Sequence, residues 1–91
     1  MYEDVRSVVG PKWSLAILAF LSEESPQNFS AIETRFNTSS DVITERLRLL
    51  VAYDLVDRTE HTRRDVRYGI TDRGDRILEL ITDLHQLLVI D

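Results

Sequence analysis

The feature that most constrains this chain is a change in the spacing of apolar residues along its 91 positions. Up to about residue 52, and again from residue 72, apolar side chains recur at the intervals typical of helices. Between these stretches, residues 55–60 and 66–70 have the pattern of two strands. The apolar face of the second strand comprises Val66, Tyr68 and Ile70. These patterns predict a mostly helical α+β fold that contains one hairpin.

Helices are predicted on both sides of the hairpin. The second is apolar nearly all round, so it is expected to be buried on more than one side. Pro11 suits its first position, because proline lacks the amide hydrogen that the start of a helix leaves unpaired. The predicted helices cover residues 2–9, 12–22, 30–37, 40–52 and 72–90.

Side chains that can cap helices set several of these boundaries. Ser30 and Glu33 have the spacing of a capping box, and Phe29 can staple the same helix start. Ser39 is the expected N-cap of the next helix, and Thr71 that of the last. The predicted loops are residues 23–27 and, between the two strands, residues 61–65.

The order of these elements indicates how the chain is organised. Two short helices joined by a tight polar turn and followed by a two-stranded hairpin form a winged helix-turn-helix. A chain of this length is expected to form one domain. Its expected parts within residues 1–91 are N-terminal helices at 1–22, a helix-turn-helix at 30–52, a wing hairpin at 55–70 and a long dimerisation helix at 72–90.

Composition excludes several classes of function. The chain contains no cysteine, so it lacks disulfides and thiolate chemistry. Its two histidines, His61 and His85, are far apart, and no nucleophile, metal set or glycine-rich phosphate loop is evident. We therefore expect no enzyme activity, no catalytic or metal-ligating residue and no cofactor. The acidic N-terminus and the short apolar runs predict neither a signal peptide nor a membrane span, and a cytoplasmic protein is expected.

The charged residues are unbalanced in two respects, their net charge and their ratio of lysine to arginine. The formal net charge is −5, and Lys12 is the single lysine among eleven basic residues. An acidic, arginine-rich chain fits a halophile, whose proteins stay soluble in salt through net charge. A GC-rich genome, which favours arginine codons, explains the same composition, so both readings stay open.

Two motifs of the chain are Gly10-Pro11-Lys12-Trp13 and, at residues 39–50, SSDVITERLRLL. The first resembles the Gly-Lys-Trp opening of the HxlR family of winged-helix regulators, and the second is similar to that family's recognition helix. The segment from Val66 to Gly74 resembles the exit from the wing. The resemblance implies a homodimeric DNA-binding transcription regulator that dimerises through its terminal helices. The chain departs from the family in lacking an N-terminal cysteine and in having Asp54 in place of a glycine. MarR-like, ArsR-like and PadR-like regulators share the fold.

Candidate DNA contacts come from the predicted recognition helix and its cap. The N-terminal part of such a helix enters the major groove, where hydroxyl, carboxylate and guanidinium groups can contact bases or phosphates. The two acids can alternatively face solvent and favour the positive end of their own helix. These candidates are Ser39, Ser40, Asp41, Thr44, Glu45 and Arg48.

Further candidates lie outside this helix. Residues 58–76 contain six arginines against four acids, in a chain that is acidic overall. Arg63, Arg64 and Arg67 are expected to reach the phosphate backbone or the minor groove, unless they only make the hairpin soluble. Asn28 and Ser30, at the start of the third helix, could bind another phosphate.

The last helix carries a seam of apolar residues at the spacing of a coiled coil. This seam and the first helix are expected to form a dimer interface. The predicted interface residues are Val5, Val8, Ile77, Ile81, Leu84 and Leu88.

The sequence therefore predicts a homodimer that binds a palindromic operator in double-stranded DNA. The alternative is a winged helix that contacts only other proteins, which the acidic net charge favours and the clustered arginines oppose. Trp13, Phe20 and Phe36 could line an effector pocket or simply pack in the core. The operator, any small-molecule effector and the direction of regulation stay undetermined.

Overall fold

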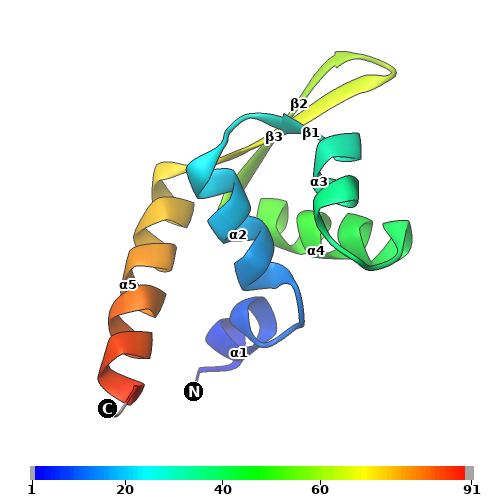
Figure 1. Ribbon diagram of the computed structural model, residues 1–91. Coiled ribbons are helices and arrows are strands. Elements are labelled where there is room, and N and C mark those ends of the chain that lie inside the picture. Colours follow the sequence, from blue (N-terminus) through cyan, green and yellow to red (C-terminus); the bar gives the residue numbers. More distant parts are fainter. Residues whose placement is uncertain (1, 90–91) are drawn as a thin grey trace.

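A computed structural model describes residues 2–89. Figure 1 shows α2 at the centre, with α3 and α4 on one side, α5 on the other and a long hairpin projecting beyond them. This confirms the mostly helical winged helix-turn-helix with a long C-terminal helix. The elements are α1 (Glu3–Val9), α2 (Ser14–Glu23), β1 (Gln27–Asn28), α3 (Phe29–Arg35), α4 (Ser40–Ala52), β2 (Val56–Thr62), β3 (Asp65–Ile70) and α5 (Asp72–Leu88).

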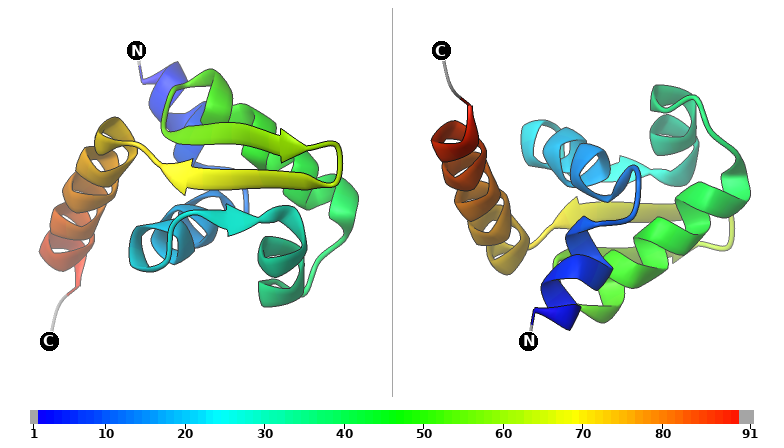
Figure 2. Two further views of the ribbon diagram at one scale, coloured as in Figure 1. Left: turned by 90° about the horizontal axis from the view of Figure 1, so that it is seen from above. Right: turned by 90° about the horizontal axis from the view of Figure 1, so that it is seen from below.

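The sheet has one strand more than the predicted hairpin. Its antiparallel order is β1-β3-β2, with Gln27 paired to Tyr68. The three strands lie side by side over α2 and α4 in Figure 2. Ser25 fixes this pairing, because its hydroxyl donates to the carbonyl of Leu21 and accepts from the amide of Ile70. A strand of two residues has no periodicity, so the sequence pattern showed only a loop at residues 23–27.

The predicted starts of two helices are wrong. Asn28, not Ser30, caps α3, and its side chain accepts a hydrogen bond from the amide of Ala31 at 2.8 Å. Ser30 therefore lies within the first turn, and Phe29 is the first helical residue. Helix α2 begins at Ser14, after Trp13 with a φ of 80°, so Pro11 precedes the helix instead of occupying its first position.

Helices α4 and α5 begin where the sequence predicts. The Ser39 side chain accepts from the amide of Val42, and that of Thr71 accepts from the amide of Gly74. Helix α5 is described to Leu88, and position 90 of the predicted helix lies outside the described residues.

The wing turn is tighter than predicted. Strand β2 runs to Thr62 and β3 starts at Asp65, so Arg63 and Arg64 alone form the turn, instead of five residues at 61–65. The pairing register shifts between Glu60 and Thr62. The Thr62 hydroxyl also accepts a hydrogen bond from the amide of Arg64. These contacts close a short turn without glycine.

The core forms where α2 meets the helix-turn-helix and the base of the hairpin. Ile17 and Leu18 of α2 and Ile43 and Leu50 of α4 are fully buried. The remaining core residues are Val8, Leu21, Ile32, Phe36, Leu47, Leu55 and Val56. Other elements pack against α2 on several sides. This confirms the expectation that a helix apolar nearly all round is buried on more than one side.

Asp54 has a left-handed backbone, with a φ of 59°, between α4 and β2. Its carbonyl accepts a hydrogen bond from the Thr71 hydroxyl at 2.7 Å, so the neighbouring chain holds this conformation. Glycine adopts it without the steric cost that a Cβ imposes.

We expect Asp54→Gly to raise the free energy of unfolding by about 0.5 kcal/mol, after allowance for the greater entropy of unfolded glycine. The melting temperature should rise by about 2–4 °C. The matched control, Asp57→Gly in the exposed part of β2, should lower it. A lower melting temperature for Asp54→Gly would show that the aspartate side chain stabilises the turn.

Candidate nucleic-acid interface

Helices α3 and α4 are joined by a hydrogen bond across their turn. The Ser40 hydroxyl donates to the carboxylate of Glu33. The sequence assigned Glu33 to a capping box, but its carboxylate accepts this bond instead. Ser39 uses its hydroxyl oxygen as the cap of α4. Ser39 and Ser40, two of the three serines predicted to meet DNA, therefore have structural roles within the helix-turn-helix.

The exposed face of α4 keeps three polar side chains free for a ligand. Within residues 2–89, no hydrogen bond or ion pair engages the side chain of Asp41, Thr44 or Arg48. Glu45 lies 3.6 Å from Arg46, whose Nε donates to the carbonyl of Lys12 at 2.9 Å. The Arg46 side chain thus contacts its own chain.

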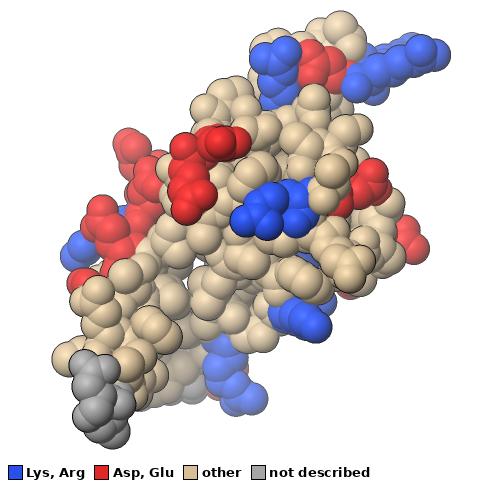
Figure 3. Space-filling model, in the orientation of Figure 1, with Lys and Arg blue, Asp and Glu red and all other residues tan. Residues whose placement is uncertain are grey.

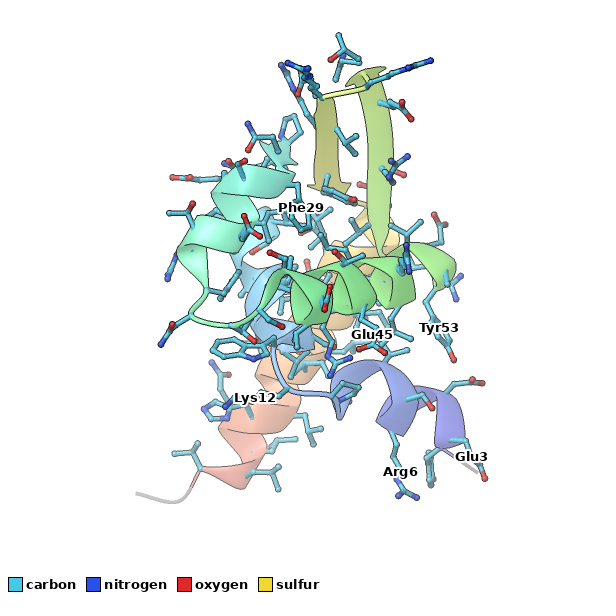
Figure 4. All side chains as sticks on the ribbon, turned by 90° about the vertical axis from the view of Figure 1, so that its right-hand side faces the viewer. Glu3, Arg6, Lys12, Phe29, Glu45 and Tyr53 are labelled. Atoms are coloured by element: carbon cyan, nitrogen blue, oxygen red, sulfur yellow. The ribbon has the colours of Figure 1, made fainter. Side chains whose placement is uncertain are left out.

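A hollow of about 530 Å³ separates α4 from the wing. Thr44 and Arg48, one helical turn apart, line one wall, and Arg58 and Tyr68 line the wing side. Phe29 lies between α3 and the hairpin, above α4 in Figure 4. The fold thus brings Arg48 and Arg58 to one hollow. The predicted site omitted Arg58, because its sequence separation from Arg48 gives no sign that they meet.

The arginines of the wing differ in how far their charge is neutralised. Arg67 forms two hydrogen bonds with the carboxylate of Asp65, at 3.2 and 3.0 Å, and this pair lowers the pKa of Asp65. Arg58 lies 3.7 Å from Glu60. At the turn, no ion pair within the described chain engages Arg63 or Arg64. Basic side chains gather at the far end of the hairpin in Figure 3. The unneutralised charge of the wing is therefore concentrated at its tip.

The predicted phosphate site at the start of α3 stays a prediction. The Asn28 side-chain oxygen accepts from the Ala31 amide, so this part of the side chain caps the helix. Ser30 is exposed in the first turn. Neither residue points to a phosphate site by itself.

The predicted dimer residues fall into two groups. Val5, Leu84 and Leu88 are 54%, 52% and 71% exposed, and the inner seam residues Ile77 and Ile81 are half-buried. A groove of about 380 Å³ between α1 and α5 collects most of these side chains, together with Leu80.

Val8 requires a correction. It is 6% exposed and packs in the core of its own chain, so it can supply only the floor of that groove. The spacing of three valines in a short helix does not show which of them turns inward.

The three aromatic residues considered for an effector pocket pack on one another. The Phe36 ring lies 5.8 Å from Trp13 and 5.9 Å from Phe20, measured between ring centroids. Arg35 covers both phenylalanine rings, at 5.8 Å from Phe20 and 5.7 Å from Phe36. Their contacts are those of a packed cluster at the end of α3.

Two other features are absent from the described residues, a metal-binding cluster and a membrane-spanning helix. Residues 2–89 contain no group of three His, Cys, Asp or Glu side chains that could hold a metal ion. No helix in that part of the chain is long and apolar enough to cross a membrane.

A helix-turn-helix followed by a projecting two-stranded hairpin places the chain in the winged helix-turn-helix class. Residues 8–89 match the family model described as HxlR-like helix-turn-helix, so the chain belongs to this family. Membership makes the protein a helix-turn-helix regulator of transcription and not an enzyme.

Relatives with known sequences or structures agree with this assignment. An uncharacterized HTH-type transcriptional regulator from Halalkalibacterium halodurans is 28% identical over 81 residues, which cover 86% of this chain and 72% of the relative. The reduced form of the regulator YodB from B. subtilis superposes with a TM-score of 0.79 at 25% identity, covering 92% of this chain and 84% of YodB. A possible HxlR family transcriptional factor from Thermoplasma volcanium gives a TM-score of 0.76 at 26% identity, covering 92% and 77%.

Proposed function

We propose that the protein binds double-stranded DNA in the cytoplasm as a homodimer, with α4 in the major groove and the wing on the phosphate backbone. The observation that carries this proposal is the unneutralised charge around one hollow. Arg48 lines it, and Arg63 and Arg64 extend from the hairpin that forms its other wall, in a chain whose net charge is −5. An acidic chain has no solubility requirement for arginines at this position.

The division of labour follows from what each group can recognise. Phosphates carry no sequence information, so Arg63 and Arg64 position the protein on DNA of any sequence. Thr44, Arg48 and Asp41 are the free side chains of the helix that enters the groove, so they read base edges. Two copies related by a twofold axis place two such helices about 34–36 Å apart, which matches a palindromic operator.

The double variant Arg63→Ala, Arg64→Ala should weaken binding to all duplexes by roughly tenfold or more, because it removes charge-assisted phosphate contacts. Thr44→Ala should instead change the preference among operator variants, by about 1–3 kcal/mol for a lost base contact. Both are measured by fluorescence anisotropy with an operator and a scrambled duplex. The operator is first selected from genomic fragments.

The matched control is Arg6→Ala with Arg76→Ala, which removes the same charge from α1 and α5. It should leave DNA affinity within about twofold, because exposed charges this far from the duplex are screened. If the wing variant binds both duplexes as wild type does, the wing is not on the phosphates. A wild-type protein that binds no DNA would favour the protein-contact alternative, for which the acidic net charge argues.

The net charge also predicts an unusual salt response. Raising KCl weakens the attraction of the wing arginines, but it screens the repulsion between DNA and the many acids elsewhere. We therefore expect affinity to fall much less steeply between about 0.1 M and 2 M KCl than the orders of magnitude typical of basic DNA-binding proteins. The melting temperature should rise with KCl, as in a halophilic protein. A steep loss of affinity without a gain in melting temperature would assign the arginines to codon usage.

A further inference from the structure

Two hydrogen bonds join α4 to the N-terminal segment of the chain. The Arg46 side chain, near the middle of α4, donates to the carbonyl of Lys12 at 2.9 Å. The Tyr53 hydroxyl, at the C-cap of α4, donates to the carboxylate of Asp4 in α1 at 2.9 Å. In Figure 4, Tyr53 lies at the end of α4 on the side of α1, and Lys12 lies below the helix toward its α3 side. Helix α4 is thus held at two points along its length.

The segment that holds α4 also belongs to the apolar groove. Asp4 and Tyr53 line the groove between α1 and α5, beside the exposed Val5. A second copy that covers this groove would therefore pack directly against the Tyr53–Asp4 hydrogen bond. The bond with the Asp4 carboxylate also raises the pKa of Tyr53.

The turn before α2 contacts the other helix of the helix-turn-helix as well. Trp13 follows Lys12 in that turn, and its ring packs on Phe36 at the end of α3. The backbone at Trp13 is left-handed, which shows that surrounding contacts determine its conformation. The N-terminal segment therefore contacts both α3 and α4.

We propose that Arg46 and Tyr53 are positioning residues, which fix α4 relative to the N-terminal segment and couple packing at the α1–α5 groove to operator affinity. This inference rests on the proposed DNA-binding dimer. Buried apolar side chains hold α4 against the core, but apolar contacts have little directionality. Hydrogen bonds have defined distances and angles, so two of them restrict sliding and rocking of the helix. Base contacts require such placement, whereas phosphate contacts tolerate more displacement.

The central test compares Tyr53→Phe, Asp4→Ala and the double variant, with Asp4→Asn as the conservative variant that keeps an acceptor oxygen. Tyr53→Phe and Asp4→Ala should each lower operator affinity about threefold to tenfold, which is the effect of one lost hydrogen bond. The double variant should lose no more than either single variant, and Asp4→Asn should bind nearly as wild type does. Affinity for a scrambled duplex should stay unchanged in all four.

Two further variants complete the set. Arg46→Met removes the second hydrogen bond but keeps the aliphatic part of the side chain, and it should also lower operator affinity selectively. Tyr2→Phe is the matched control, because it removes the hydroxyl of an exposed tyrosine next to α1. This control variant should bind the operator with the affinity of wild type. Sedimentation and melting curves establish that every variant is folded and show its assembly state.

Amide hydrogen exchange of the free protein separates this inference from the proposed function. Tyr53→Phe and Arg46→Met should speed exchange in α4 relative to α5, whether or not DNA is bound. If wild type fails to prefer the operator but α4 exchange rises in the variants, the proposed function fails and the positioning role stands. The inference would be overturned if the losses of operator affinity in the two single variants multiplied in the double variant. It would also be overturned if a variant lost as much affinity for scrambled DNA as for the operator, or if exchange in α4 stayed unchanged.

Discussion

A variant carrying Leu84→Glu and Leu88→Glu is expected to be a folded monomer that has lost about a hundredfold or more in operator affinity. Both leucines are largely exposed on α5, at 52% and 71%, so the substitutions leave the core of one chain intact. In a dimer they would be buried, and burying unpaired carboxylates is costly. The energetic penalty therefore falls on assembly alone.

The loss of DNA affinity follows from the loss of linkage between two binding modules. When one copy binds its half-site, the second copy of a dimer binds as an intramolecular step, and such linkage raises avidity by about 10²–10⁴. A monomer has only the affinity of a single half-site. This effect exceeds that of any single base or phosphate contact in the proposed interface.

The control for this prediction is Thr82→Glu with Gln86→Glu, which adds the same charge to the opposite face of α5. It should stay dimeric and keep most of its operator affinity. Sedimentation velocity at micromolar protein measures the mass, and anisotropy measures DNA binding. A wild-type monomer under these conditions, or a charged double variant that remains a dimer, would contradict the proposed interface.

The largest expected effect on stability comes from Gly74→Ala in the first turn of α5. A Cβ at this position would lie 2.2 Å from the backbone oxygen of Leu55 and 2.8 Å from the Ile70 side chain. The same oxygen accepts a hydrogen bond from the Thr71 amide, so it cannot move without disturbing the junction of wing and helix. We expect a loss of about 3 kcal/mol, typical of overpacking. The melting temperature should fall by about 10–20 °C.

The sign of this effect distinguishes packing from helix propensity. By propensity alone, alanine would stabilise a helix by about 1 kcal/mol relative to glycine. Gly69→Ala is the matched control, because its Cβ would meet nothing closer than 3.8 Å, and it should leave the melting temperature unchanged or raise it. Calorimetry measures both variants. An equal or higher melting temperature for Gly74→Ala would show that α5 and the wing can shift apart.

The sequence by itself was sufficient for the features that depend on local patterns. The periodicity of residues 40–52 and the caps Ser39 and Thr71 predicted α4 and α5, because burial of one face and capping involve neighbours within a turn or two. The alternation of apolar and polar residues predicted a strand of the hairpin, because burial of one face of a strand also depends on neighbouring positions. The motif order predicted the family, which the match over residues 8–89 confirms.

Only the tertiary structure decided how individual polar side chains are used. Ser40 bonds to Glu33 across a turn, Arg67 is neutralised by Asp65, and Arg58 reaches the hollow beside α4. These partners depend on how elements approach one another, which residue spacing does not encode. A serine that caps, bridges helices or contacts DNA has the same local sequence signature.

The same limit applies to contacts between distant segments. Strand β1 exists because β3 offers it an open edge, and Tyr53 meets Asp4 across 49 positions of sequence. Val8 turned inward, although its spacing equally allowed an outward position on α1. Local periodicity determines which faces of a helix are apolar, but the packing of the whole chain decides which of them its own core buries and which remain exposed for a partner.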